Sequence, residues 1–170
     1  MSYSPSIPPE ALQFIRGSTS STAADIVSTL NSPVVIRRIG DLAHPAVGQM
    51  GLFASKKILS RTLIIDYLGE AHADERLDSD YDLSLHRAQP EEGVYISVGI
   101  DATRMGNEAR FINDYRGVRT KPNAIFKERR TLSGELRMSV WSDSETIKKG
   151  DEILVSYGKS WWQTRQQKEY

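Results

Sequence analysis

Two short stretches of the sequence place glycine and polar residues where they could bind a small ligand. The stretch HPAVGQMGLFA, residues 44–54, is a turn rich in proline and glycine that leads into an apolar run. Gly48 and Gly51 lack a Cβ, so the backbone there can approach a ligand closely. The stretch GNEARFINDYRG, residues 106–117, contains an apolar run, predicted to be a buried strand, that ends abruptly at Asn113. Most turns of this kind bind nothing, so neither stretch identifies a site by itself.

Two tyrosines follow apolar runs in the middle and near the end of the chain. Tyr67 follows TLIID and Tyr157 follows EILVS. A tyrosine at a strand end offers an apolar ring, and its hydroxyl can orient a substrate amine or stabilise charge in a transition state. In an arbitrary β-protein such tyrosines are more often half-buried packing residues, and the adjacent Trp161 and Trp162 more often form a hydrophobic contact. Residue type alone leaves both interpretations open.

The length and composition of the chain exclude several classes of protein. The sequence has 170 residues, about one domain, and its 22 basic side chains balance 22 acidic ones, so no global basic field attracts nucleic acid or an anionic membrane. It has no cysteine, and its three histidines lack ligand spacing, so we expect no metal site. No apolar run approaches the ~18 residues of a membrane span. These features predict a soluble protein located inside the cell, in the nucleus or cytoplasm.

The elements that must position these residues are mostly strands. From Pro33 onward, Gly and Asp separate eight short β-type runs: VVIRRI, GLFAS, RTLIIDYLG, GVYISVGID, ARFIN, NAIFKE, LRMSVWSD and EILVSY. Residues 1–33 are rich in Ser, Thr and Pro and contain two helix-like patches, PPEALQFIR and SSTAADIVSTL. We therefore predict a mostly β domain over residues 34–162. A partly helical N-terminal appendage precedes it, and a tail of residues 163–170 follows.

Two segments carry opposite local charge. Residues 70–93, EAHADERLDSDYDLSLHRAQPEEG, are strongly acidic, and we expect a mobile, solvent-facing insert there. Residues 104–130 are rich in arginine and lysine, but the stretch 116–130 has neither the interleaved aromatic residues nor a known motif of a nucleic-acid site. Both segments are most simply solvated surfaces. The acidic one is also where a basic peptide would dock.

Five stretches, taken in order along the chain, resemble the motifs of the SET domain, the fold of one class of protein lysine methyltransferases. They are GQMGLFA, IIDYLGE, IDATRMGNEARFIN, PNAIF and IKKGDEILVSYG, and the resemblance runs from about Val34 to Trp162. It implies small curved sheets and a C-terminal motif threaded beneath the loop that contains Asn113. It also implies that the protein uses S-adenosylmethionine to methylate a lysine of a protein or peptide, such as a histone.

The resemblance assigns a role to individual residues of this sequence. Tyr157 takes the place of the essential catalytic tyrosine, and Tyr67 would line the channel that admits the substrate lysine. Phe126 and Val155 would lie along the same channel. The expected cofactor contacts are Gly48, Gln49, Met50, Gly51, Arg110, Asn113, Asp114 and Trp162.

The chain departs from the family pattern in two places. Gln49 stands where the first glycine of the turn is usual, and Gly48 lies one residue earlier. Asp114, Tyr115 and Arg116 replace the usual His-Ser-Cys. The acid at position 114 either lies near the positive sulfonium of the cofactor or only caps the turn. A catalytically silent SET-fold module that binds a peptide or a partner is therefore the alternative to an enzyme.

Overall fold

The structure is a computed structural model that describes residues 1–17, 32–88, 95–159 and 161–162. The helix expected at residues 20–30 and the tail at 163–170 lie outside this part of the chain. The chain folds into two compact units, each assembled from segments that are distant in the sequence. Unit 1 comprises residues 1–32, 63–110 and 126–141, and unit 2 comprises residues 33–62, 111–125 and 142–170.

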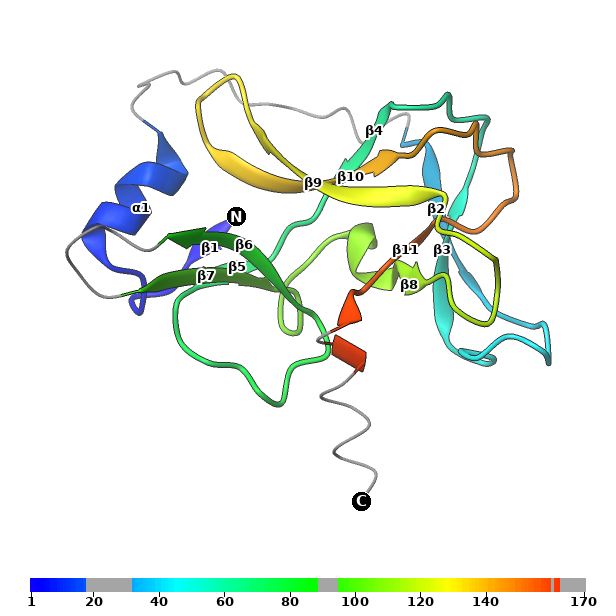
Figure 1. The fold of residues 1–170 in the computed structure, drawn as a ribbon, viewed down its shortest axis with the longest axis horizontal. Helices are drawn as coiled ribbons and strands as arrows, with labels where there is room; N and C mark the ends of the chain where they lie inside the picture. Colours follow the sequence, from blue (N-terminus) through cyan, green and yellow to red (C-terminus); the bar gives the residue numbers. More distant parts are fainter. Residues whose placement is uncertain (18–31, 89–94, 160, 163–170) are drawn as a thin grey trace. The chain divides into compact units, whose positions relative to one another are not determined.

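Two small sheets form the framework of unit 1 (Figure 1). One sheet has the order β1-β5-β7-β6, and the other has the order β4-β10-β9. Strand β1 runs parallel to β5, whereas the β5–β7, β6–β7 and β4–β10 pairs are antiparallel. The strands are β1 Ser2–Tyr3, β4 Leu63–Asp66, β5 Glu70–His72, β6 Asp82–Ala88, β7 Ile96–Asp101, β9 Ala124–Arg130 and β10 Leu136–Ser142.

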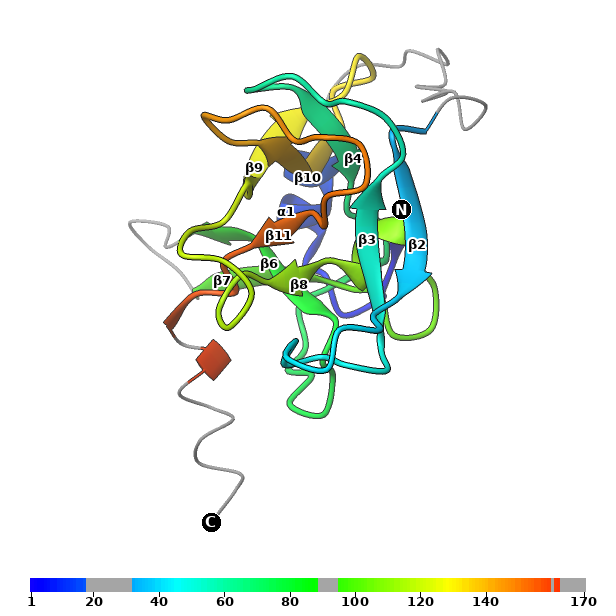
Figure 2. The same ribbon diagram turned by 90° about the vertical axis from the view of Figure 1, so that its right-hand side faces the viewer.

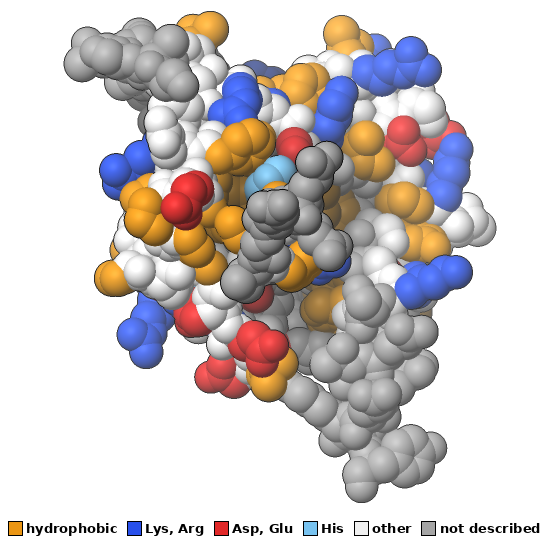
Figure 3. Space-filling view, turned by 60° about the vertical axis from the view of Figure 1, so that its left-hand side comes forward, with side chains coloured by type: hydrophobic (Ala, Val, Ile, Leu, Met, Phe, Trp, Pro, Cys, Tyr) orange, Lys and Arg blue, Asp and Glu red, His pale blue; other side chains and the backbone are white. Residues whose placement is uncertain are grey.

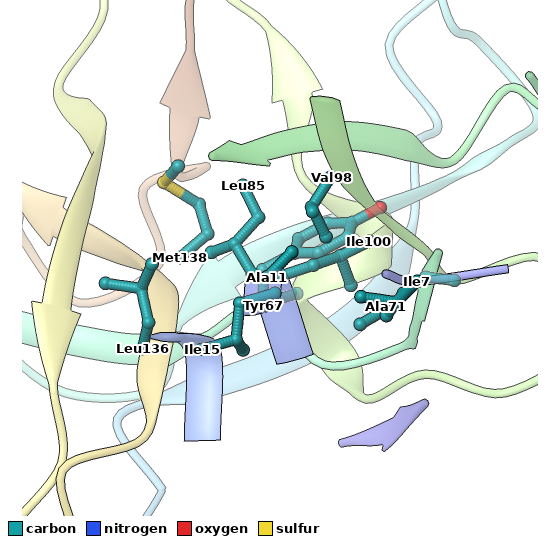
Figure 4. Packing of buried hydrophobic residues seen from close by; sticks show 12 residues of the cluster. Ile7, Ala11, Ile15, Tyr67, Ala71, Leu85, Val98, Ile100, Leu136 and Met138 are labelled. Carbon is teal, nitrogen blue, oxygen red and sulfur yellow. The ribbon is translucent and has the colours of Figure 1, made fainter. Parts of the chain in front are cut away.

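The helix α1, Pro9–Arg16, contributes to the hydrophobic core of unit 1 (Figure 4). Proline suits the first turn of a helix because the amide hydrogen that it lacks would have no partner there. Ala11 and Ile15 are buried on one side of the helix, and Ile7 is buried just before it. The N-terminal segment thus supplies a strand and a helix to this unit, and the expected boundary at residue 33 stays a prediction. Among the described residues, no helix is long and apolar enough to cross a membrane.

The acidic segment 70–93 contains regular structure, contrary to the expectation of a mobile insert. Its described part supplies β5 and β6 to the four-stranded sheet. In β6 the side chains of Leu83 and Leu85 alternate with polar ones, and Leu85 is almost completely buried. The acidic composition concealed this alternation of apolar and polar residues.

Unit 2 contains two pairs of strands (Figure 2). The strands β2, Val34–Arg38, and β3, Met50–Ala54, pair antiparallel along their whole lengths. The strands β8, Asn113–Asp114, and β11, Leu154–Val155, pair parallel although they are distant in the sequence. The chain is therefore mostly β with small sheets, as the sequence predicted.

Strand β11 passes through the loop that follows β8. The amide of Tyr115 donates to the carbonyl of Val155 at 2.9 Å, on one side of β11. The amide of Asn123 donates to the carbonyl of Leu154 at 3.1 Å, and the Asn123 side chain accepts from the Leu154 amide at 2.8 Å. Because both ends of loop 115–123 bond to β11, the C-terminal motif has the threaded arrangement that the sequence motifs imply.

The run ARFIN is not a strand, contrary to the sequence prediction. A 3₁₀ helix, η2, occupies Glu108–Phe111, and only the two residues of β8 that follow are extended. The Asn107 side chain fixes this turn, because it donates to the Asp66 carbonyl at 2.8 Å and accepts from the Leu68 amide at 3.2 Å. An apolar run that is anchored by a polar side chain at its start can form a short helix as readily as a strand.

Candidate functional site

Asn113, at the start of β8, lies against the turn that precedes β3. Its amide nitrogen donates to Oε1 of Glu152 at 2.9 Å and lies 3.4 Å from the Met50 carbonyl oxygen. A Cβ at Gly51 would lie 2.7 Å from Oε1 of Glu152 and 3.3 Å from the Asn113 amide nitrogen. A side chain at position 51 would have to displace the Glu152 carboxylate, and the structure brings Gly51, Met50 and Asn113 together.

The turn at residues 48–50 differs from the family pattern in where its glycine stands, but its backbone is held by hydrogen bonds. Gly48 has φ +83°, a left-handed conformation that favours glycine, and its amide donates to the Ile39 carbonyl at 2.9 Å. Gln49 therefore does not need to be glycine, and its amide donates to the Ala46 carbonyl at 3.0 Å. Residues 48–50 are exposed, although the amides of Gly48 and Gln49 are hydrogen-bonded within unit 2.

Asp114 uses its carboxylate to hold other parts of unit 2. One oxygen accepts from the Arg116 amide at 2.9 Å. The other accepts from the Tyr157 amide at 2.8 Å and from Nε1 of Trp162 at 3.3 Å. The side chain is buried. The acid at this position therefore caps the turn, one of the two roles that the sequence left open.

Tyr157 has its hydroxyl held in a defined position. The hydroxyl donates to the Ile112 carbonyl at 2.7 Å, and the ring makes an edge contact with Trp161 at a centroid distance of 4.7 Å. Val155, expected along the substrate channel, is fully buried in unit 2. The candidate catalytic tyrosine and the expected cofactor residue Asn113 thus belong to the same unit.

Tyr67, Phe126 and Arg110 belong to unit 1 instead. Tyr67 is almost completely buried in the core, and its hydroxyl donates to the Tyr81 carbonyl at 2.8 Å (Figure 4). The Phe126 ring meets the Tyr67 ring edge-on at a centroid distance of 6.0 Å. The Arg110 guanidinium lies over the Tyr81 ring, 4.3 Å from its centroid. Two of the three proposed channel residues, Tyr67 and Phe126, therefore contact each other within one unit.

The turn before β3, the strand β8 and the C-terminal motif meet around Asn113, and we call this region the junction of unit 2. Two residues that the sequence analysis did not assign, His44 and Glu152, also belong to it. Nε2 of His44 lies 3.0 Å from Oε2 of Glu152, and Nδ1 accepts from the Ala46 amide at 3.0 Å. The side chains of His44 and Glu152 are only 6% and 9% exposed. The position of Glu152 inside the last motif was a hint, whereas nothing local in the sequence links His44 to it.

The basic segment 104–130 uses several of its charges in ion pairs. Arg129 makes two hydrogen bonds to the buried Asp66 carboxylate, at 2.9 and 2.6 Å. Arg119 and Lys121 both pair with Glu145. On the face drawn in Figure 3, basic side chains lie in separate groups with hydrophobic and acidic side chains between them. These contacts favour the interpretation of this segment as a solvated surface.

Comparison with known proteins connects this geometry to a family. The family model of the SET domain matches residues 49–158, a segment that contains Asn113, Glu152 and Tyr157. The chain belongs to the SET domain family. A histone-lysine N-methyltransferase set-2 of Caenorhabditis elegans is 33% identical over 127 residues, which cover 68% of this chain and 7% of that protein. This SET domain chain thus corresponds to a small part of the length of that relative.

Proposed function

We propose that this SET domain is an S-adenosylmethionine-dependent protein lysine methyltransferase. The observation that carries the proposal is the threaded junction of unit 2, where β11 pairs with β8 and Asn113 lies against Gly51. There the Tyr157 hydroxyl donates to the carbonyl of Ile112, the residue that precedes Asn113. The name of the Caenorhabditis elegans relative supports a histone lysine, or a lysine in another basic peptide, as the substrate. Such a substrate implies an intracellular site of action, in the nucleus or cytoplasm.

The residues of the junction suit the charged amino-acid end of the cofactor. Among the described residues, no group donates to Oδ1, the side-chain oxygen of Asn113, so this oxygen is left as an acceptor for a ligand. The Glu152 side chain is only 9% exposed and forms no ion pair with any lysine or arginine of the described segments, so a carboxylate there favours a cationic ligand. The proposed contacts are the exposed turn Gly48, Gln49 and Met50, then Gly51, Asn113, Asp114 and Trp162 in unit 2, and Arg110 in unit 1. When bound, the cofactor supplies a methyl group on a positively charged sulfur.

The protein's own residues must keep the substrate amine neutral and hold it in line. A free lysine has a pKa near 10.4, so deprotonating it at neutral pH costs about 4.6 kcal/mol unless the site lowers that pKa. The proposed channel residues are apolar or aromatic: Tyr67 and Phe126, whose rings meet in unit 1, and Val155, which is buried in unit 2. Apolar surroundings disfavour the charged amine. The Tyr157 hydroxyl, held at the Ile112 carbonyl, orients the amine and stabilises developing charge.

The decisive variant is Tyr157→Phe, which removes one hydroxyl and keeps the ring. Methyl transfer to histones or lysate proteins should fall about 10²–10³-fold, the size of effect expected when one preorganised polar group is lost from an active site. The measurement is incorporation of a labelled methyl group from S-adenosylmethionine. Tyr95→Phe is the matched control, because Tyr95 is more than half exposed and its loss of a hydroxyl should leave labelling unchanged. Equal labelling by the wild type and Tyr157→Phe would remove Tyr157 from the mechanism.

A catalytically silent module that binds a peptide or partner is the second candidate. It is favoured by Asp114, whose carboxylate is engaged in internal hydrogen bonds where relatives carry a different triplet. Calorimetry with S-adenosylmethionine and S-adenosylhomocysteine separates the two functions. Absence of binding would support the silent module, whereas binding followed by transfer to any lysine substrate would support the enzyme.

A further inference from the structure

A continuous series of hydrogen bonds runs through the interior of unit 2 and ends at Asn113. The Ala46 amide and Nδ1 of His44 are 3.0 Å apart, and Nε2 of the same ring is 3.0 Å from Oε2 of Glu152. The second oxygen of Glu152 is 2.9 Å from the Asn113 amide nitrogen. The two central side chains are buried. Residues that are about a hundred positions apart in sequence are thus linked side chain to side chain.

The direction of each hydrogen bond in this series follows from the chemistry of the groups. A backbone amide only donates, so Nδ1 of His44 accepts and carries no proton. The neutral ring therefore carries its proton on Nε2 and donates it to Glu152. The Asn113 side-chain atom that faces both Glu152 and the Met50 carbonyl meets two acceptors, so it is the NH₂ group. Its carbonyl oxygen is the atom left for a ligand.

The hydrogen-bond partners of the Glu152 carboxylate supply no positive charge. Both of its partners, His44 and Asn113, are neutral donors, and none of the described lysines or arginines pairs with it. A buried charge without a counterion is costly for stability. The missing side chain at Gly51 leaves the space that this carboxylate fills. A cationic group bound near Asn113 would compensate the charge.

We propose that His44 and Glu152 are positioning residues that hold the Asn113 amide with its oxygen toward the ligand, so that the site selects a ligand carrying a protonated amino group. The inference rests on the proposed function, in which Asn113 binds the amino-acid end of S-adenosylmethionine. His44 and Glu152 act through Asn113 and do not themselves touch the ligand.

The variant Glu152→Gln tests the proposal because it keeps the shape of the side chain and changes its hydrogen bonding. The oxygen of the new amide can accept from His44, but its NH₂ group then faces the NH₂ group of Asn113. Rotation of the more exposed Asn113 amide relieves this conflict and turns a donor toward the ligand. We expect this variant to bind S-adenosylhomocysteine about tenfold to a hundredfold more weakly. Its affinity for deaminated S-adenosylhomocysteine, the analogue that lacks the α-amino group, should be nearly the same as that of the wild type.

An exchange variant separates positioning from a general loss of packing. Combining Glu152→Gln with Asn113→Asp restores a donor facing an acceptor, presents an acceptor oxygen to the ligand and keeps the wild-type net charge. The preference for the ligand with the amino group should return in this double variant. Glu145→Gln is the matched control because it makes the same chemical change in the same unit, at a side chain that is half exposed.

The experiment is calorimetry of the whole chain with S-adenosylhomocysteine and its deaminated analogue, together with ¹H–¹⁵N spectra of the histidine side chains without ligand. The proposal predicts the Nε2-protonated tautomer for His44, a lost preference in Glu152→Gln and a recovered preference in the exchange variant. Equal weakening of both ligands by Glu152→Gln, no recovery on exchange, or a proton on Nδ1 of His44 would overturn it. Failure of the wild type to bind S-adenosylhomocysteine would instead refute the proposed function on which the inference rests.

Discussion

Among single residues, Asp114 shows how this chain compensates for a departure from its family. Its carboxylate accepts from the amides of Arg116 and Tyr157 and from the indole of Trp162. The Arg116 guanidinium also lies over the Trp162 ring, 5.3 Å from its centroid. One acidic side chain thus fixes the turn after β8, the backbone of the candidate catalytic tyrosine and the aromatic residue beyond it.

The variant Asp114→Asn should therefore destabilise the fold. A neutral amide has one acceptor oxygen, so at least one buried donor loses its partner, which costs about 1–3 kcal/mol. We expect the free energy of unfolding in urea to fall by this amount, with a changed tryptophan emission because the Trp162 indole loses its acceptor. Asp78→Asn, at an exposed position, should leave both unchanged. Identical denaturation curves for the two variants would contradict the structural role of Asp114.

The sequence predicted some residues of the site and missed others for a physical reason. Gly51, Asn113 and Tyr157 were predictable because each stands at a fixed place in a short motif. The contact between His44 and Glu152 joins positions 108 residues apart and depends on how the loop before β3 folds over the last motif. No local spacing encodes such a contact, so only the structure places His44 at the junction.

Among the elements, β5 and β6 are joined by a buried histidine as well as by their common neighbour β7. Nε2 of His72, in β5, lies 2.9 Å from Oδ1 of Asp82, the first residue of β6, and Nδ1 lies 2.8 Å from the Asp74 carbonyl oxygen. Both partners are acceptors, which suits a doubly protonated ring. Burial lowers the pKa of His72, but the hydrogen bond to Asp82 and its charge outweigh burial and leave that pKa raised, although Arg76 opposes this.

The raised pKa of His72 predicts a pH dependence of stability with a definite sign. The protonated ring stabilises the fold fully below the unfolded pKa of about 6.5, and this contribution is lost as pH rises through the higher folded pKa. The free energy of unfolding in urea should therefore decrease over that interval. His72→Gln should flatten the decrease, whereas His86→Gln, at a partly exposed position in β6, should retain it. A decrease of the same size in His72→Gln and the wild type would exclude His72 as its source.

The elements were predictable where one short run carries its own pattern. Runs such as VVIRRI and LRMSVWSD became β2 and β10 because their apolar residues face a core. The acidic segment was misleading because some of its charges are paired within the fold: Arg76 bonds Glu70 and Asp74 of this segment, and Asp101 of β7. These partners meet only when β5 and β7 pair, so composition alone suggested free charge.

Across the whole molecule, both of the oppositely charged segments contain local ion pairs. In the basic segment, Arg129 pairs with Asp66, and Arg119 and Lys121 pair with Glu145. Arg76 does the same for the acidic one. The docking of a basic peptide on the acidic segment stays a prediction, and exposed acids such as Glu75 and Asp78 would have to carry it.

The division of the chain into two units suggests a division of roles. Apart from Arg110, the proposed cofactor contacts belong to unit 2, whereas Tyr67 and Phe126 belong to unit 1. Phe126→Leu removes the edge contact with Tyr67, worth about 0.5–1.5 kcal/mol, and alters the proposed lysine channel. We expect KM for a lysine peptide to rise up to about tenfold, while Kd for S-adenosylhomocysteine stays unchanged.

The control for this division is Leu132→Ala, at a position 83% exposed in the same unit, which should leave KM and Kd as in the wild type. Peptide methylation kinetics and calorimetry of each variant give the two quantities separately. A loss of cofactor affinity in Phe126→Leu as large as the rise in KM would show that Phe126 also affects cofactor binding. Because the Phe126 ring packs against Tyr67 and the core of unit 1, an effect confined to KM is the expected outcome.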